Sequence, residues 1–389
     1  MPQHEAQSTK HKAQSTPREL GYRMPAEWEP HQATWLSWPH KEASWPGKLH
    51  LILPVYARMV AALARSEPVH INVNDFEMQR SARRLLDAAG ADGEIHFRLF
   101  PTNDAWCRDH GAIFVVQGVA GAERSGAPAV AATAPGASQS LTPSHPAALA
   151  ATDWGFNAWG NKYPPFDLDD QIPRRMAEFL NVPRFDGGMI LEGGSIDVNG
   201  RGLLLTTEAC LLNPNRNPHL GRDQIEQRLR DFLGVSRVLW LGEGIVGDDT
   251  DGHVDDLARF VAPNVIVAAI EDDPADANYE PLQQNWQRLT ALAETTTPRL
   301  EIIPLPMPPA VVYEAQRLPA SYANFYIGNR VILLPGFDPE RDRQAAGVLR
   351  PFFPDREIVT IGCTDLVWGL GAFHCLTQQV PAVPLTPGA

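Results

Sequence analysis

Cys375 is the residue in this sequence whose setting most suggests covalent chemistry. It follows a histidine and a glycine-rich, proline-free stretch within residues 369–379. A free cysteine is usually a small buried hydrophobic residue, and its thiolate must be favoured before it can react. Cys375 alone is therefore a candidate nucleophile, and other loops must supply a base and groups that bind a substrate.

Three further loops contain carboxylates and an imidazole. Asp109 precedes an apolar run, and Glu192 stands before two glycines, which allow close approach of the backbone to a ligand. His253 and Asp255 are two residues apart and would share one face of an extended segment. Asp109 beside Arg108 also fits a surface ion pair, and Glu192 fits a solvated turn residue. The joint occurrence of these types in successive loops favours the functional interpretation.

The acidic run at 248–256 invites comparison with metal sites. It lacks the spaced acidic ligands and the closing glutamate of a calcium loop. His253 suits zinc, but neither an H-E-x-x-H motif nor a histidine or cysteine near it in the chain accompanies it. The sequence therefore predicts no metal site.

Amphipathic patterns predict helices, most of them followed by a short β-rich run. The helices are expected at 54–66, 77–90, 172–181, 223–234, 280–295 and 339–353. The β-rich runs are 70–75, 95–100, 238–241, 300–305 and 357–361. Gly234 stands where a helix C-cap glycine belongs.

After several of these runs, a polar loop precedes a second apolar strand. Such strands are expected at 112–116, 257–270 and 326–334. A unit of strand, loop, strand and helix that recurs about five times predicts a cyclic, propeller-like α/β fold. An open doubly wound sheet is the alternative, although the sequence has no G-x-G-x-x-G motif or P-loop to support a nucleotide site.

The composition restricts the partners and the compartment. Lys plus Arg number 33 against 46 Asp plus Glu, a net charge of −13, which disfavours nucleic acid and anionic membranes. The four cysteines (Cys107, Cys210, Cys363 and Cys375) are too widely spaced for a disulfide framework. No apolar run approaches the roughly 18 residues that a membrane span needs. We expect a cytoplasmic protein, and a homo-oligomer is possible.

Two segments differ from the rest of the chain in composition. Residues 1–19 are polar and predict a disordered tail, and residues 118–148 are rich in Ala, Gly, Pro and Ser. Such segments bury too little apolar surface to offset the entropy of ordering. We predict one domain over residues 20–383 with a surface insertion at 118–148.

Five ordered motifs resemble the agmatine deiminase family, which is grouped with the Porphyromonas-type peptidylarginine deiminases. They lie at 24–31, 106–111, 191–197, 250–255 and 371–379, within a similarity that runs from about residue 21 to residue 381. The resemblance implies the pentein fold, a five-bladed α/β propeller of pseudo-symmetric ββαβ units.

The resemblance also implies a role for each candidate residue. Cys375 would be the nucleophile, His253 the general acid and base, Glu192 its partner, and Asp109 and Asp255 the carboxylates that bind a guanidinium. A planar, permanently cationic guanidinium calls for carboxylates and a thiolate. The implied reaction converts agmatine, a small cationic guanidine, and water to N-carbamoylputrescine and ammonia through a covalent thiouronium, in polyamine metabolism and without metal or cofactor.

The substrate remains open at this stage. Where members of the family carry Gly-Pro after the W-x-R-D-x motif, this chain has Gly111-Ala112. Where they carry Gly-Gly-Gly before the His-Cys pair, this chain has Gly-Leu-Gly-Ala-Phe at 369–373. The remaining predicted substrate-binding residues are three tryptophans, Trp35, Trp38 and Trp106. They would line a narrow channel and make cation–π contacts to the substrate. The alternative is that they pack in the core. Deimination of arginine in peptides, another small guanidine, an amidinotransferase and a non-catalytic guanidine-binding protein remain alternatives.

Overall fold

The computed structural model describes residues 15–117 and 148–383. Most of the predicted tail and nearly all of the predicted insertion lie outside these residues. Residues 15–19 are ordered, however, because Arg18 donates its backbone N–H to the carbonyl oxygen of Asp231 at 2.9 Å. Ordered structure therefore begins before the predicted boundary at residue 20.

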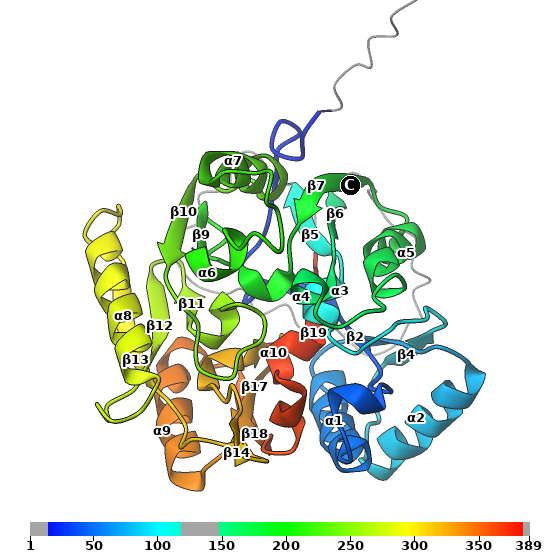
Figure 1. Ribbon diagram of the computed structural model, residues 1–389. Helices are drawn as coiled ribbons and strands as arrows, with labels where there is room; N and C mark the ends of the chain where they lie inside the picture. The colour runs from blue at the N-terminus through cyan, green and yellow to red at the C-terminus, as the bar shows by residue number, and fades with distance from the viewer. Residues whose placement is uncertain (1–14, 118–147, 384–389) are drawn as a thin grey trace, which may run out of the picture.

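The described residues form five β-sheets around a central axis, with one further two-stranded hairpin. In each sheet an inner strand pairs antiparallel with a second strand, and that second strand pairs parallel with a third. A helix connects the second strand to the third. The long helices lie at the periphery and the short helices near the centre (Figure 1). This arrangement confirms the predicted five-bladed α/β propeller.

Four units follow one another along the chain. They are β5 (Ile113–Gln117), β6 (Leu149–Gly155), α5 (Ile172–Leu180) and β7 (Arg184–Ile190); β8 (Asp197–Val198), β9 (Leu203–Thr207), α7 (Arg222–Leu233) and β10 (Arg237–Leu241); β11 (Ala258–Ala262), β12 (Val265–Ile270), α8 (Tyr279–Ala293) and β13 (Glu301–Pro306); β16 (Tyr326–Ile327), β17 (Val331–Gly336), α9 (Pro339–Leu349) and β18 (Glu357–Gly362).

Both ends of the described chain build the fifth unit. Its inner strand is β19 (Thr377–Pro381), which pairs with β2 (His31–Ser37). The unit continues through α1 (Leu49–Ala64) to β3 (Val69–Asn72) and then through α2 (Phe76–Ala88) to β4 (Ile95–Arg98). Strand β1 (Tyr22–Arg23) borders β5, and β14 (Val312–Tyr313) with β15 (Gln316–Arg317) forms the separate hairpin. Pairing of β19 with β2 closes the ring.

Helix α7 shows why the sequence folds as it does locally. Ile225, Leu229 and Leu233 recur every four residues and are all buried, so they form one apolar stripe that faces the sheet. The side chain of Gln224 accepts from the backbone N–H of Gly221 at the N-terminus. Gly234 ends the helix with φ +67°, the left-handed conformation predicted for a C-cap glycine.

All six predicted helices are present, with boundaries shifted by at most five residues. Two of the predicted single strands each span two strands and the turn between them. Residues 257–270 form β11 and β12, joined by a turn at Pro263 and Asn264, and residues 326–334 likewise contain β16 and the start of β17. Apolar residues on both sides of each turn hide it in the pattern.

Each inner strand is preceded by a single helical turn. These turns are α3 (Cys107–His110), η3 (Gly193–Ser195), η4 (Val254–Asp256), η5 (Tyr322–Asn324) and α10 (Phe373–Leu376). Each contacts the next in this order, and α10 contacts α3, so the five turns form a closed ring near the axis. The predicted functional loops therefore meet at one place.

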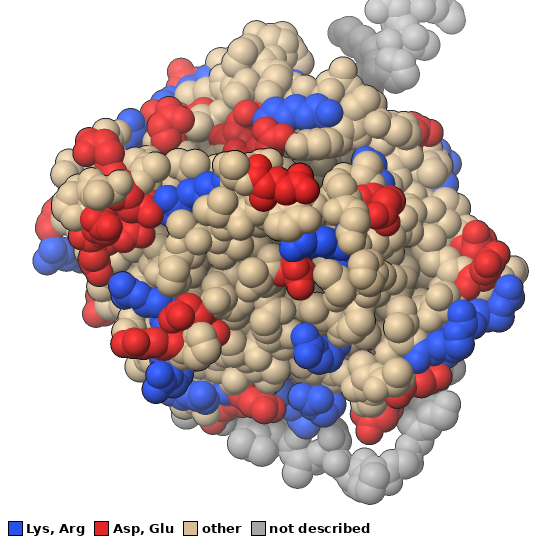
Figure 2. Space-filling view, turned by 60° about the horizontal axis from the view of Figure 1, so that its bottom comes forward, with Lys and Arg blue, Asp and Glu red and all other residues tan. Residues whose placement is uncertain are grey.

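The surface shows acidic and basic side chains interspersed over the face drawn in Figure 2, rather than separated into patches of one sign. None of the helices in the described part of the chain is long and apolar enough to cross a membrane.

Candidate active site

The ring of helical turns brings the predicted site residues together. Asp109 lies in α3, Glu192 precedes η3, and Cys375 lies in α10. His253 precedes η4 and Asp255 lies within it. All five are at most 5% exposed, so the site excludes most water and strengthens every electrostatic interaction in it.

His253 faces the carboxylate of Asp109, with 3.7 Å between Nδ1 and Oδ1. The backbone N–H of Gly194 donates to the same Oδ1 at 2.9 Å. A Cβ at Gly194 would lie 2.6 Å from His253 Nδ1 and 2.8 Å from Asp109 Oδ1. Glycine is therefore required here, since any side chain would separate the imidazole from the carboxylate.

The Cys375 thiol is held between an amide and a carboxylate. Asn324 Nδ2 donates to Sγ at 3.0 Å, and the thiol donates to Asp255 Oδ2 at 3.6 Å. Asn324 Oδ1 also accepts from the backbone N–H groups of His374 at 3.1 Å and Cys375 at 3.3 Å. Asn324 thus fixes the backbone of the cysteine turn and provides a donor that would stabilise a thiolate.

The surrounding charges shift the ionisation of the reacting groups. Burial, with the nearby carboxylates of Asp255, Asp256 and Asp109, raises the pKa of Cys375 well above its usual value. Burial lowers the pKa of His253, but Asp109, Cys210 and Asp255 together outweigh it, and the imidazole pKa is raised well above its usual range. These shifts favour a neutral thiol at Cys375 and a charged imidazole at His253.

A buried ionic network supports Asp255. His374 bonds through Nδ1 to Asp255 Oδ2 at 2.7 Å and through Nε2 to Glu27 Oε2 at 2.8 Å. Glu27 also accepts from Arg108 at 3.1 Å and Arg259 at 2.8 Å. Burial raises the pKa of Glu27, but Arg259, His374 and Arg108 outweigh it and hold the value well below its usual range. The network fixes one oxygen of Asp255 and leaves the other free.

The free polar atoms of the site face one another. In the described structure, Asp255 Oδ1, Glu192 Oε2 and both ring nitrogens of His253 are buried without a hydrogen-bond partner. An unsatisfied buried polar atom costs about 1–3 kcal/mol. Such atoms in a carboxylate-rich site are suited to a ligand that is cationic and rich in N–H donors, as a guanidinium is.

A cavity of about 260 Å³ leads to this cluster. Asp109 and Cys375 lie among its lining residues, together with Trp106, Trp159 and Trp368. The structure thus brings Trp106 to the cavity, as the sequence predicts.

The other two predicted tryptophans do not line this cavity. Trp35 is fully buried, stacks on His70 at 4.7 Å between ring centroids, and donates from Nε1 to Asn72 Oδ1. Trp38 is 3% exposed and packs edge-on against Tyr56. We correct the prediction for both: they belong to the core, because each of them lies in β2 or directly after it, with its ring against other aromatic residues.

Trp159 is a site residue that the sequence did not predict. Its Nε1 donates to Asp109 Oδ2 at 2.9 Å. Residues 158–161 all have positive φ, between 48° and 89°, and Asn157 accepts from the Gly160 N–H at 2.9 Å. This backbone is costly for residues other than glycine, so the segment stores strain where it presents the indole to the cavity.

The sequence indicated some of the other unpredicted site residues more strongly than others. His374 adjoins Cys375, and Glu27 lies within the motif at 24–31, so both had a signal. Asn324 lies in η5, the helical turn before β16, and belongs to none of the motifs. Trp159 had no sequence signal, since it depends on the unusual backbone around it.

The propeller and its central thiol, imidazole and carboxylates place the chain among the pentein enzymes that modify guanidine groups. It belongs to the Porphyromonas-type peptidyl-arginine deiminase family, whose model matches residues 23–381. This finding agrees with the family resemblance of the five motifs.

Named relatives match almost the whole chain. The agmatine deiminase of Pseudomonas aeruginosa is 36% identical, over 95% of this chain and 98% of its own. That of Medicago truncatula is also 36% identical, over 95% and 99%. The structure of the Enterococcus faecalis agmatine deiminase superposes with a TM-score of 0.82 at 32% identity, covering 95% of this chain and 98% of that one.

Proposed function

We propose that this protein is an agmatine deiminase, which hydrolyses agmatine to N-carbamoylputrescine and ammonia. The observation that carries the proposal is the buried cluster of Cys375, His253, Glu192, Asp109 and Asp255, of which Asp109 and Cys375 line one cavity. Two relatives with that name, 36% identical and matched over nearly their full length, support the same activity.

Binding would use the atoms that are now unpaired. The guanidinium would donate to Asp255 Oδ1 and Glu192 Oε2, while the Asp109 carboxylate, already bonded to Gly194 and Trp159, adds negative charge. Its positive charge offsets the carboxylates that raise the pKa of Cys375. The bound substrate thereby favours the thiolate that attacks it.

In the first half-reaction, the Cys375 thiolate forms a bond to the guanidinium carbon and gives a tetrahedral adduct. His253 donates a proton to the departing nitrogen, and the C–N bond breaks to release ammonia. An S-alkylthiouronium on Cys375 remains. The raised pKa of His253 ensures that the imidazole carries the proton it must give.

In the second half-reaction, the now neutral His253 removes a proton from water, and the hydroxide attacks the thiouronium carbon. The C–S bond breaks and the hydroxyl proton is lost to solvent, which returns the thiolate of Cys375 and leaves a neutral ureido group on the product. Asn324 Nδ2, 3.0 Å from Sγ, supports the thiolate as leaving group.

The charges of the cavity favour agmatine over arginine. Among the described lining residues, Lys41 is the single cation, and it is 3.4 Å from Asp104. Asp249 also lines the cavity. The carboxylate of an arginine would need a free cationic partner, whereas the second cationic group of agmatine suits these acidic walls.

We also propose a cytoplasmic location. All four cysteines are free and buried, which suits a compartment that keeps thiols reduced. Cell fractionation with an antibody to the protein tests this; recovery in an exported fraction would contradict it.

The experiment compares agmatine, free arginine and a peptide with a C-terminal arginine. We expect the purified protein to release ammonia and N-carbamoylputrescine from agmatine in equal amounts, measured by coupled assay and mass spectrometry. Turnover of the other two substrates should be slower by orders of magnitude. Heat-denatured protein provides the background.

Two outcomes separate the alternatives. Preferential release of ammonia from the peptide would overturn the substrate and retain the mechanism. An amine acceptor added to the reaction identifies an amidinotransferase, because a guanidinylated acceptor would then replace ammonia as the product.

A further inference from the structure

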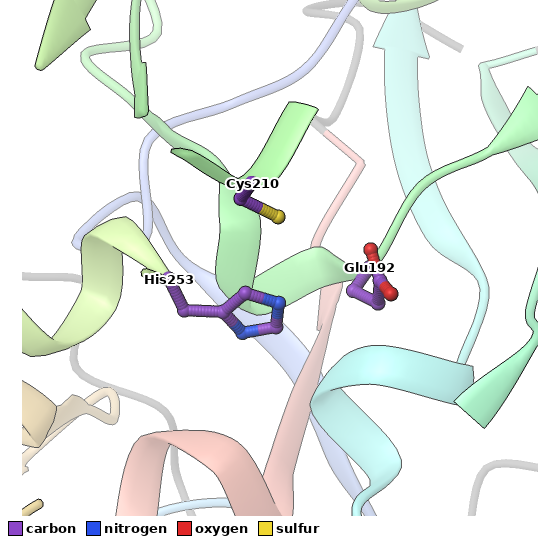
Figure 3. A group of neighbouring side chains, drawn as sticks. All are labelled: Glu192, Cys210 and His253. Carbon is purple, nitrogen blue, oxygen red and sulfur yellow. The ribbon is translucent and has the colours of Figure 1, made fainter. Parts of the chain in front are cut away.

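Glu192, Cys210 and His253 form a buried group of three possible metal ligands. One ligand atom from each, a carboxylate oxygen, a thiol sulfur and an imidazole nitrogen, lies within 4.8 Å of the others. Cys210 lies in the short helix α6 (Glu208–Leu211), at the end of β9. In Figure 3 the side chains of Cys210 and Glu192 lie near the ring of His253. Cys210 is 43 residues from His253 in the chain, so the sequence did not predict this group.

The ligand atoms in this group have unused bonding capacity. Both ring nitrogens of His253 and Oε2 of Glu192 are buried without a hydrogen-bond partner among the described residues. Arg216 Nε donates at 2.7 Å to the other oxygen, Oε1, and so orients the carboxylate with Oε2 free. All three side chains are 0% exposed. Fully buried, unpaired atoms that converge from three elements are suited to a ligand that accepts their lone pairs.

The donor set identifies the class of cation. Sulfur, imidazole nitrogen and carboxylate oxygen in a compact group are ligands of Zn²⁺ and of the softer Cd²⁺, whereas Mg²⁺ and Ca²⁺ prefer oxygen alone. Three protein ligands leave a fourth position for water or another ligand. The neighbouring Asp109 carboxylate, 3.7 Å from His253, adds negative charge that further favours a cation.

We propose that Glu192, Cys210 and His253 bind a thiophilic divalent cation, Zn²⁺ or Cd²⁺, and that its binding switches the enzyme off. This inference rests on the proposed function, because it assigns regulation to the same site. The Cys210 thiol loses its proton to solvent when the metal–sulfur bond forms. His253 also loses a ring proton to solvent and donates the freed lone pair to the metal, so it can neither protonate the departing nitrogen nor deprotonate water. Metal and guanidinium are both cations that use Glu192, so they compete.

Cys210 also has an ordinary structural interpretation. It is part of an apolar core cluster with residues such as Leu211 and Leu229, where a small hydrophobic side chain is enough. If Cys210 only packs in the core, Cys210→Ala should alter stability alone. If Cys210 is a metal ligand, the same substitution should alter metal affinity. The two interpretations therefore give different results in a binding measurement.

The direct test uses Cd²⁺ alone and the full chain with Cys375→Ala, which removes the competing nucleophilic thiol. A cadmium–thiolate bond gives an ultraviolet charge-transfer band, so the titration reports both affinity and the number of thiolates. We expect one thiolate per protein. Adding Cys210→Ser or Cys210→Ala should abolish the band or raise the dissociation constant more than about 100-fold.

The matched control is Cys363→Ala in the same background, because Cys363 is buried in another core cluster and should leave the band unchanged. Far-ultraviolet circular dichroism checks that each variant is folded. A band that persists in both folded Cys210 variants, or the lack of a band with Cys210 present, would overturn the proposal. This readout needs no turnover, so it stands apart from any failure of the proposed activity.

The second arm measures ammonia release from agmatine with Cys375 present. We expect Zn²⁺ to inhibit, more agmatine to weaken the inhibition, and Cys210→Ser to raise the half-inhibitory concentration at least about tenfold relative to its own uninhibited rate. Equal inhibition of the Cys210→Ser variant and the unaltered protein would show that the metal acts elsewhere.

Discussion

The residues of the proposed active site have unpaired atoms that suit a cation. Asp255 and Glu192 each use one carboxylate oxygen for a positioning contact, to His374 and Arg216 respectively, and each leaves the other oxygen unpaired. Burial, together with the carboxylates of Asp255, Asp256 and Asp109, raises the pKa of the Cys375 thiol and so disfavours its thiolate. Substrate charge thus couples binding to activation of the nucleophile.

The first prediction concerns the ionisation of Cys375. Its thiol should titrate above its usual value of 9.0, and Asp255→Asn should lower the pKa by at least about one pH unit, because an ionised carboxylate no longer opposes the thiolate. Thiolate absorbance against pH measures this, with Cys375→Ala as the subtracted background. Asp272→Asn, at an exposed position, is the control and should change nothing. A pKa that stays constant or rises in Asp255→Asn would refute the electrostatic account.

The sign of the effect on stability follows from the same shift. The folded protein holds the Cys375 proton more tightly than the unfolded chain, which titrates near 9.0. Stability from this group is therefore fully present below that pH and is lost as the pH rises toward the higher pKa of the folded state.

The second prediction concerns His374, which positions Asp255 and does not touch the substrate. His374→Ala should lower kcat/KM by about 10–100-fold, mainly through KM, because Asp255 loses its orienting partner. His374→Asn should recover part of the loss, since an amide placed like Nδ1 can still donate to Asp255. Steady-state kinetics with agmatine measures both. His96→Asn, at a solvent-exposed histidine, is the control, and a His374→Ala enzyme with unchanged KM would show that the contact is only structural.

Residue types, spacing and the family resemblance together predicted residues that the structure brings into one cluster, and were less informative about the groups that position them. Cys375, His253 and Glu192 stand beside glycines or in unusual polar loops, which gave them a signal. Asn324 and Glu27 act through partners far away in the chain, so their types alone said little. A tryptophan suits a channel wall and a core equally well, so only the packing of Trp35 and Trp38 shows that they lie in the core.

At the scale of elements, a single helical turn before each inner strand is the device that holds the site. Five such turns contact one another in a ring within the described chain. A helical turn directs its side chains and ends in a short, buried strand, so each loop has little freedom. The site is as rigid as the strands behind it.

The third prediction compares two glycines, one at the end of a helix and one inside a helix. Gly234 ends α7 with φ +67°, and a Cβ there would lie 2.4 Å from the carbonyl oxygen of Tyr22. Gly234→Ala should therefore destabilise the protein by about 1–3 kcal/mol. Gly347 is exposed within α9, and a Cβ added there would meet no atom within 4 Å, so Gly347→Ala should stabilise by about 0.5–1 kcal/mol. Chemical denaturation measures both, and changes of the same sign would contradict the assignment.

Periodicity predicted the helices well, because each has one apolar face of several turns. It did not predict the hairpins of β11 with β12 and of β16 with β17, where buried strands are apolar on both sides of a short turn. Strand pairing depends on residues distant in sequence, which no local pattern contains.

At the scale of the whole molecule, the fold closes by joining both ends of the described chain. The pairing of β19 with β2 completes the fifth unit and fixes the strand that directly follows Cys375. The sequence predicted a cyclic fold from repetition, and the resemblance of its motifs named that fold. Neither the repetition nor the resemblance shows that β19 pairs with β2 to close the ring.

The fourth prediction concerns the segment between β5 and β6. Gln117 donates its backbone N–H to the Ala148 carbonyl oxygen at 2.9 Å, and Val116 pairs with Leu149. The two strands are therefore close enough for a tight hairpin turn. Replacing residues 118–147 by Asn-Gly should leave the fold and the rate of agmatine hydrolysis within about a factor of two, since this dipeptide suits a two-residue hairpin.

Circular dichroism and the ammonia assay test this replacement. The matched control inserts Asn-Gly without removing residues 118–147. A folded shortened chain that has lost its activity would show that the segment takes part in function.

The proposed mechanism depends most on Cys375 as the nucleophile. The rate of ammonia release from agmatine by the Cys375→Ala variant tests this role most directly. We expect a loss of at least about 10⁴-fold, while calorimetry still detects agmatine binding through the retained carboxylates. Cys363→Ala, which removes another buried thiol, should keep the rate of the unaltered protein. Ammonia release by Cys375→Ala at a rate similar to that of Cys363→Ala would contradict the account.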